Sequence, residues 1–270
     1  MAAELAVVIV GMNTRDWVRG CLQSLRAHDD VALEIVVVDN CSEDGSCEMV
    51  EEAFPEATLI RNSAPYGFAQ NNNIGAAQTS APILLFLNPD TEVPPGALRA
   101  MLTVIKRQPD CGIFGGQLAD ADRETERSVG AFPTLTSLAI DRLLGALSLL
   151  RPLLDRHSQR HYLRYDREHQ VAWTTGAYLW IRRDVFDALK GWDSEIFMYG
   201  EDADLCYRCY ELGHSVLYTP ESQAFHYHNK VPIDRARRKR LLREGLTLFA
   251  HKHYGPLRAK IYRRILGWLW

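Results

Sequence analysis

The chain has 270 residues, of which 47% are hydrophobic, enough apolar material for a globular protein of one large or two small domains. Its six cysteines lack the repeated pairs of a zinc site, so we interpret them as free thiols in a reducing compartment. A strand-like run begins within a few residues of Met1 and leaves no room for a signal peptide, so we expect a cytoplasmic protein.

The formal charge of −3 conceals a strongly basic C-terminal segment. From residue 229 to the end there are twelve Lys or Arg residues and only two acidic ones, Asp234 and Glu244, whereas the rest of the chain is acidic. We therefore expect residues 231–270 to form a separate basic helical tail that seeks an anionic surface.

Alternating apolar runs and helical patterns in the first half predict a parallel sheet. The runs predict strands over 5–10, 33–38, 58–61, 83–87 and 111–118. Helices are expected between them, with starts and stops marked by Pro, Gly and Asn. Because strand–helix–strand units join parallel strands by right-handed crossovers, the fold class is α/β, with a Rossmann-like, mostly parallel sheet flanked by helices.

The second half has a less regular pattern. Residues 119–134 are polar and lack periodicity, and the leucine-rich stretch 135–154 is too short and too charged to span a bilayer. That stretch is either a pair of core helices or a lip that faces a membrane. A strand is then expected over 171–182, a helix from Gly200 to Leu212, and a last strand over 216–218.

Two acidic sites follow from this layout. The apolar run 83–87 is stopped by Asn88-Pro89-Asp90, and ligands of open α/β sheets bind outside the carboxyl ends of the strands, so Asp90 is expected to face a cleft. Taken alone, this motif could be a simple strand-ending turn. The second site is the acidic start of the helix at Gly200, where the helix dipole alone could favour carboxylates.

Taken together and in this order, the motifs resemble those of glycosyltransferase family 2 with the GT-A fold, most closely the bacterial rhamnosyltransferase-type enzymes of cell-surface polysaccharide synthesis. The motifs are Val8-Ile9-Val10, Val36 to Asn40, Asn62 with Gly67-Phe68 and Asn73, Leu87 to Asp90, Gly200 to Leu205, and His226. The resemblance implies one GT-A domain over 1–230, with a nucleotide-sugar-binding half at 1–118 and an acceptor or catalytic half at 119–230.

The resemblance implies an inverting enzyme that moves a sugar, rhamnose being one candidate, from a UDP- or dTDP-sugar to a hydroxyl of a saccharide or lipid-linked acceptor. Asp202 matches the base that deprotonates the acceptor hydroxyl, and Glu201 would orient it. Mg²⁺ or Mn²⁺ would neutralise the donor diphosphate. Asp90 and His226, rather than His228, match the metal ligands, but Asn88 replaces the first carboxylate of the family's Asp-x-Asp motif.

The same resemblance implies a donor site at the carboxyl ends of the first strands. Asp39 matches the carboxylate that accepts from the imide N–H of uracil or thymine and so selects pyrimidine nucleotides. The complete set expected to bind the nucleotide sugar is Asn13, Asp39, Asn62, Gly67, Asn73, Asn88, Asp90 and Gly176.

Three other functions are alternatives to this interpretation. A catalytically silent nucleotide-sugar-binding or scaffold protein would keep the fold without turnover. A nucleotidyltransferase would need a glycine-rich, basic loop after the first strand, which residues 11–16 do not supply. The basic cluster 237–240 could bind nucleic acid phosphates, but nothing else here reads bases, so we expect no nucleic acid partner.

The end of the chain predicts a membrane-surface helix. On a helical wheel one side carries Leu257, Ile261, Ile265, Trp268 and Leu269, and the other carries Lys260, Arg263 and Arg264. With Trp270 and the basic residues 235–243, this pattern favours a peripheral position on the anionic cytoplasmic face of a membrane through residues 235–270. The alternative is a helix docked on the protein's own core.

Overall fold

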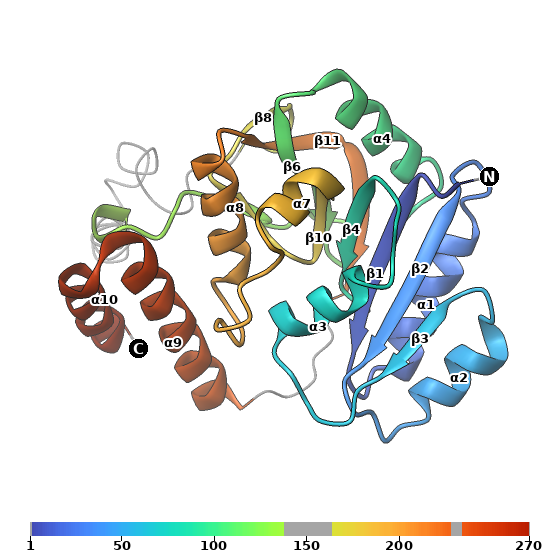
Figure 1. The fold of residues 1–270 in the computed structure, drawn as a ribbon, viewed down its shortest axis with the longest axis horizontal. Coiled ribbons are helices and arrows are strands. Elements are labelled where there is room, and N and C mark those ends of the chain that lie inside the picture. Colours follow the sequence, from blue (N-terminus) through green and yellow to red (C-terminus); the bar gives the residue numbers. More distant parts are fainter. Residues whose placement is uncertain (1, 138–163, 228–233, 270) are drawn as a thin grey trace.

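The computed structural model describes residues 2–137, 164–227 and 234–269, which form a central sheet covered by helices on both faces (Figure 1). Most of the leucine-rich stretch expected at 135–154 lies outside the described residues, as do His228 and Trp270. All six cysteines are free, as expected.

The first half is built as the sequence predicts. Four parallel strands lie in the order β3-β2-β1-β4, with β1 at Leu5–Gly11, β2 at Leu33–Asp39, β3 at Thr58–Arg61 and β4 at Ile83–Leu87. The helices between and after them are α1 at Arg15–Arg26, α2 at Ser46–Ala53, α3 at Phe68–Ala76 and α4 at Ala97–Arg107. Strands β1, β2 and β4 therefore end together at one edge, where the polar motifs follow.

The second half completes a nine-stranded sheet in which six strands share one direction. The order continues β4-β10-β6-β11-β5, with β8 paired to β11, and only β5, β8 and β10 run against the rest. Their bounds are Thr91–Glu92 for β5, Cys111–Ala119 for β6, His169–Gln170 for β8, Tyr178–Arg182 for β10 and Ser215–His226 for β11. A separate small sheet pairs β7 (Val129–Gly130) with β9 (Trp173–Thr174). The mostly parallel α/β sheet is thus confirmed.

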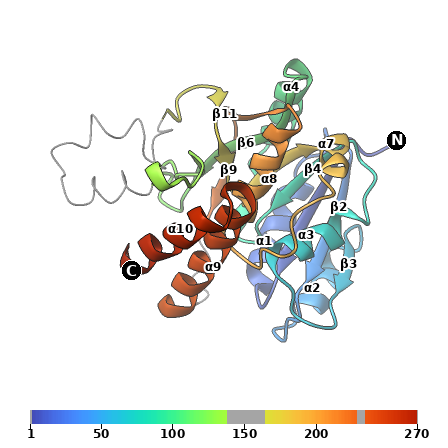
Figure 2. The same ribbon diagram turned by 60° about the vertical axis from the view of Figure 1, so that its left-hand side comes forward.

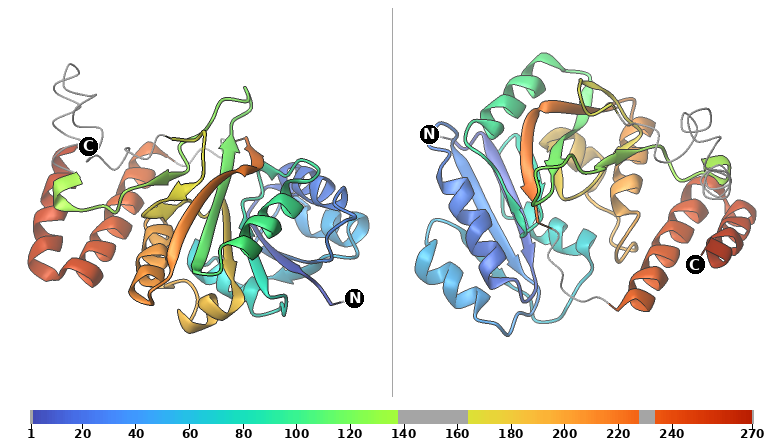
Figure 3. Two further views of the ribbon diagram at one scale, coloured as in Figure 1. Left: turned by 90° about the horizontal axis from the view of Figure 1, so that it is seen from above. Right: turned by 180° about the vertical axis from the view of Figure 1, so that it is seen from behind.

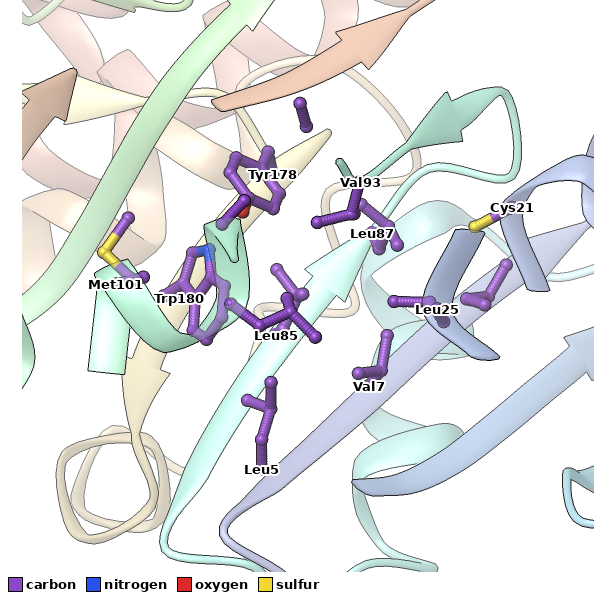
Figure 4. Packing of buried hydrophobic residues seen from close by; sticks show 14 of the residues in the cluster. Leu5, Val7, Cys21, Leu25, Leu85, Leu87, Val93, Met101, Tyr178 and Trp180 are labelled. Carbon is purple, nitrogen blue, oxygen red and sulfur yellow. The ribbon is translucent and has the colours of Figure 1, made fainter. Parts of the chain in front are cut away.

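The core has two layers, one on each face of the sheet (Figure 3). Alternate residues of β1 divide between them: Leu5 and Val7 pack beneath α1, α2 and α4, whereas Ala6 and Val8 pack against the face that carries α3, α7 and α8. Figure 4 shows the first layer, in which Trp180 of β10 lies among side chains of β4 and α4. These layers hold the carboxyl ends of the strands rigidly in place.

Two predicted strands differ from the structure. The run 171–182 is interrupted at residues 175–177, between β9 and β10, and the strand expected at 216–218 is extended to His226 as β11. Pro220, which has no N–H to donate, lies within a register shift of β11 between Thr219 and Gln223, where a missing N–H is tolerated. The extension brings His226 opposite Thr91 of β5.

The later helices are α7 (Arg183–Ala188), α8 (Glu201–Glu211), α9 (Arg235–Tyr254) and α10 (Pro256–Leu269). Helices α9 and α10 pack on each other through Ala250, Ala259, Tyr262 and Leu266, and α9 also contacts α8 (Figure 2). No helix among the described residues is long and apolar enough to cross a membrane. The domain boundary near residue 230 stays a prediction.

Candidate active site

The structure brings Asp90 and His226 together just beyond the end of β4. The His226 Nε2 atom lies 3.3 Å from Asp90 Oδ1 and 3.3 Å from the Asn88 side-chain nitrogen. Both Asp90 and His226 are buried, and a backbone hydrogen bond from Tyr227 N to Asp90 O (2.9 Å) fixes the two segments to each other. The sequence places these two residues far apart, so the fold alone creates the pair.

Glu126 is a member of this cluster that sequence reasoning missed. Its Oε2 atom lies 2.9 Å from His226 Nδ1, and its own N–H donates to Leu118 O at 2.8 Å. Burial alone would lower the pKa of His226, but hydrogen bonds with the carboxylates of Asp90 and Glu126 outweigh burial and raise that pKa to about 9. Glu126 lies in the aperiodic stretch 119–134, where no local pattern marks it.

The cluster fits a divalent cation that takes only part of its coordination from the protein. Among the described residues, no three His, Cys, Asp or Glu side chains form a ready-made metal site. Asp90 and His226 nevertheless offer one carboxylate and one imidazole side by side, and Mg²⁺-type sites commonly combine one or two protein ligands with water and substrate phosphates. A carboxylate on the far nitrogen of the imidazole, as Glu126 provides, is the usual partner of a metal-bound histidine.

A second acidic site lies at the start of α8. The side chain of Asp202 is half-buried, its carboxylate accepts a 2.8 Å hydrogen bond from the N–H of Ala203, and the main chain of Gly176 lies near enough to lower its pKa. Burial raises the pKa of Asp202 in spite of these interactions. Burial, followed by the charge of Asp202, also raises the pKa of Glu201, whose Oε2 atom has no hydrogen-bond partner among the described residues.

The third acidic residue of this helix has a structural role. Asp204 is completely buried and pairs with Arg208 Nε and His253 Nε2, each at 2.7 Å. Burial would raise its pKa, but His253 and Arg208 lower it. The guanidinium of Arg208 and the hydrogen bond with His253 therefore offset the repulsion expected among three carboxylates in one helical turn, and the sequence pattern identifies neither partner.

The interrupted strand segment connects the two acidic sites. The main chain of Gly176 lies near the Asp202 carboxylate, and the next residue, Ala177, accepts a 3.0 Å hydrogen bond from the N–H of Asn88. Asn88 in turn contacts His226. Asp202 and the Asp90–His226 pair therefore border the same region at the end of β4, with Gly176 between them.

On the expected nucleotide side, Asp39 and Asn13 occupy adjacent turns. Asp39 is buried and accepts from Ser42 N at 2.9 Å, while the main-chain N–H of Asn13 donates to Ser42 Oγ at 2.8 Å. Asn62 donates to Asn71 Oδ1 at 2.6 Å and so braces the start of α3. These contacts place the turns after β1, β2 and β3 at one edge of the sheet.

The other residues predicted to bind the nucleotide sugar hold loops in place. Asn73 makes two hydrogen bonds to the main chain of Trp192, of 2.8 and 2.9 Å. A Cβ on Gly67 would lie 2.5 Å from Phe197 O, and one on Gly176 would lie 3.0 Å from the ring of Phe68. Their contact with a nucleotide sugar stays a prediction.

Comparison with known proteins identifies the family of this chain. Residues 2–247 match the family described as "Glycosyltransferase like family 2". The N-acetylglucosaminyl-diphospho-decaprenol L-rhamnosyltransferase of Mycobacterium tuberculosis is 27% identical over 238 residues, which cover 84% of this chain and 77% of the relative. Rhamnosyltransferase WbbL of Escherichia coli is 28% identical over 232 residues, or 82% of each chain.

Solved structures show the same fold. A mannosyltransferase from Pyrobaculum calidifontis, in complex with GDP-Man and Mn²⁺, has a TM-score of 0.60 at 17% identity and covers 100% of this chain and 70% of its own. TarS of S. aureus with UDP has a TM-score of 0.59 at 15% identity, over 92% and 71% of the two chains. The family match over most of the chain, the rhamnosyltransferase relatives and the GT-A architecture show that this chain belongs to glycosyltransferase family 2 and is a sugar-transferring enzyme.

Proposed function

We propose that this chain is an inverting glycosyltransferase that moves a sugar, rhamnose in the first instance, from a UDP- or dTDP-sugar to a hydroxyl of a lipid-linked saccharide. The observation that carries the proposal is that half-buried Asp202 and the Asp90–His226 pair border the same short segment: Asp202 lies near Gly176, and Asn88, which contacts His226, is hydrogen-bonded to Ala177. The names of the rhamnosyltransferase relatives support the sugar and the diphospho-lipid acceptor.

Asp202 acts as the general base. Its carboxylate takes the proton of the acceptor hydroxyl while that oxygen bonds to the anomeric carbon of the donor, and the bond from this carbon to the diphosphate breaks. Attack from the side opposite the leaving group inverts the anomeric centre. Burial, which raises the pKa of Asp202, makes its carboxylate a stronger base near neutral pH.

Asp90 and His226 would hold Mg²⁺ or Mn²⁺ together with the donor diphosphate. The cation, when bound, neutralises the charge that the departing nucleoside diphosphate carries. Glu126 keeps the His226 ring oriented so that Nε2 is directed toward Asp90. The Mn²⁺ complex of the Pyrobaculum calidifontis mannosyltransferase supports a divalent cation in this fold.

The C-terminal helices would place the enzyme on an anionic membrane, where a lipid-linked acceptor resides. Helix α10 docks on α9 through Ala259, Tyr262 and Leu266, and Ile265 of the stripe predicted for lipid is partly buried against this contact. Leu257 is 73% exposed and Ile261 43% exposed. A groove of about 610 Å³ between the two helices is lined by Arg243, Lys260 and Arg263, among other residues, and these cations suit phosphate groups.

A donor screen tests the proposal. The purified protein would be incubated with UDP- and dTDP-sugars and a diphospho-lipid saccharide, with Mn²⁺ or with EDTA, and release of nucleoside diphosphate would be measured. We expect release with at least one pyrimidine donor, dependence on acceptor, and loss of release in EDTA. A catalytically silent scaffold would bind a donor without release under any of these conditions.

A further inference from the structure

The main chain of α9 lies directly against the segment that leads into the proposed base. A Cβ added to Gly245 would lie 1.8 Å from Tyr199 O and 2.8 Å from Met198 O, so only glycine fits at this position. Seen from the other side, a Cβ on Gly200 would approach the carbonyl carbon of Gly245 to 3.3 Å. Helix α9 thus contacts backbone immediately before Glu201.

The contacted segment has an unusual backbone. Tyr199 has a φ of +68° and Gly200 a φ of +106°, both in the left-handed region. A residue with a side chain, such as Tyr199, adopts this backbone region at an energetic cost. Such a conformation persists when the surrounding structure holds it. Helix α9 supplies part of that surrounding structure.

Side chains of α9 add two ties to the same region. His253 Nε2 lies 2.7 Å from Asp204 Oδ1, two residues beyond the proposed base. Lys252 pairs with Asp193 and Glu195, in the loop that precedes α8. Because Gly245 and His253 are two helical turns apart, they lie on one face of α9.

We infer that α9 is a positioning element of the active site, in which Gly245 and His253 hold the Tyr199–Asp204 segment so that the Asp202 carboxylate is oriented toward the acceptor. The basic C-terminal segment then has a role in the chemistry besides any role at a membrane. This inference rests on the proposed function of Asp202 as the base. Gly245 and His253 act through that residue and need not touch substrate.

The test uses the full-length protein with the substitution Gly245→Ala. Alanine favours helix over glycine by about 1 kcal/mol, so a weaker α9 cannot account for a loss of activity. We expect kcat to fall by at least about tenfold, donor affinity in calorimetry to stay within about twofold, and the acid limb of the pH profile of kcat to shift, because the carboxylate environment changes. The matched control is Gly20→Ala in α1, where a Cβ would approach only the flexible end of Glu92, at 3.3 Å.

A second pair of variants covers the case in which Gly245→Ala does not fold. His253→Leu removes the donor to Asp204 and should lower kcat, whereas His253→Gln keeps an N–H donor and should restore most of it. The inference would be overturned if both Gly245→Ala and His253→Leu kept the wild-type kcat and pH profile. It would also be overturned if these variants lost affinity for the nucleotide sugar while kcat was unchanged. Asp202→Asn is measured alongside: if it also retains kcat, the base assignment has failed, and if it alone is inactive, only the inference about α9 has failed.

Discussion

At the scale of single residues, the protonation of Asp202 makes a direct prediction. A general base must be ionised, and burial raises the pKa of this carboxyl above the value of about 4 of a free aspartate. We therefore expect kcat/KM to fall as the pH decreases from neutral, with the midpoint of the fall above pH 4. A pH–rate profile in inert buffers measures it, and a profile that stays flat from about pH 8 down to about pH 4 would contradict the assignment.

Glu126 gives a second prediction at this scale. Glu126→Gln keeps the size of the side chain but removes the charge beside His226 Nδ1. Loss of such a partner commonly weakens metal binding by about 10- to 100-fold, so we expect this loss of Mn²⁺ affinity in the presence of UDP, measured by electron paramagnetic resonance. Glu124→Gln is the control, because the side chain of Glu124 is exposed two residues away. Equal Mn²⁺ affinity in the two variants would remove Glu126 from the metal site.

The residues that the sequence predicted for the two acidic sites lie at the end of a strand or the start of a helix, each with a clear hydrophobic pattern. Asp90 follows an apolar strand and Asp202 opens a helix, so local pattern and family motif coincide there. Glu126 and His253 become partners of these residues only through long-range packing. No local signal in the sequence marks either of them, because 119–134 is aperiodic and His253 lies near the end of a long basic helix.

At the scale of elements, the sheet was predictable because its central strands are buried on both faces and form continuous apolar runs. The elements that differed are those where polar contacts decide the structure. Residues 175–177 leave the sheet, and Gly176 there lies near the Asp202 carboxylate, while β11 continues past Pro220 by a register shift. Both differences from the predicted strands occur beside the site. The backbone there positions functional side chains as well as forming the sheet.

The contact between α8 and α9 predicts a stability effect. Asp204 is fully buried between Arg208 and His253, so Asp204→Ala leaves the Arg208 guanidinium without its anion and the His253 ring without its hydrogen-bond partner. Breaking a buried pair in this way costs about 3 to 5 kcal/mol, and we expect the lower end, because Arg208 is partly exposed. Urea unfolding measures the change in the free energy of unfolding. Asp187→Ala, at an exposed position of α7, should change it by less than about 0.5 kcal/mol.

At the scale of the whole molecule, the exposed apolar residues of α10 predict where the protein works. Leu257 and Ile261 point away from the core, so Leu257→Glu with Ile261→Glu should abolish pelleting with anionic vesicles at low salt without unfolding the protein. The control is Leu212→Glu, because Leu212 is 47% exposed at the end of α8. Equal pelleting of both variants, or no pelleting of the wild type, would contradict membrane binding through α10.

The central claim concerns Asp202, and one measurement tests it most directly. Asp202→Asn keeps the shape of the side chain and removes its capacity to accept a proton, so kcat for transfer should fall by about 10² to 10⁴. Donor affinity, measured by calorimetry on the same preparation, should stay close to that of the wild type, because Asp202 acts on the acceptor. A variant that keeps more than half of the wild-type kcat would contradict the assignment of Asp202 as the base.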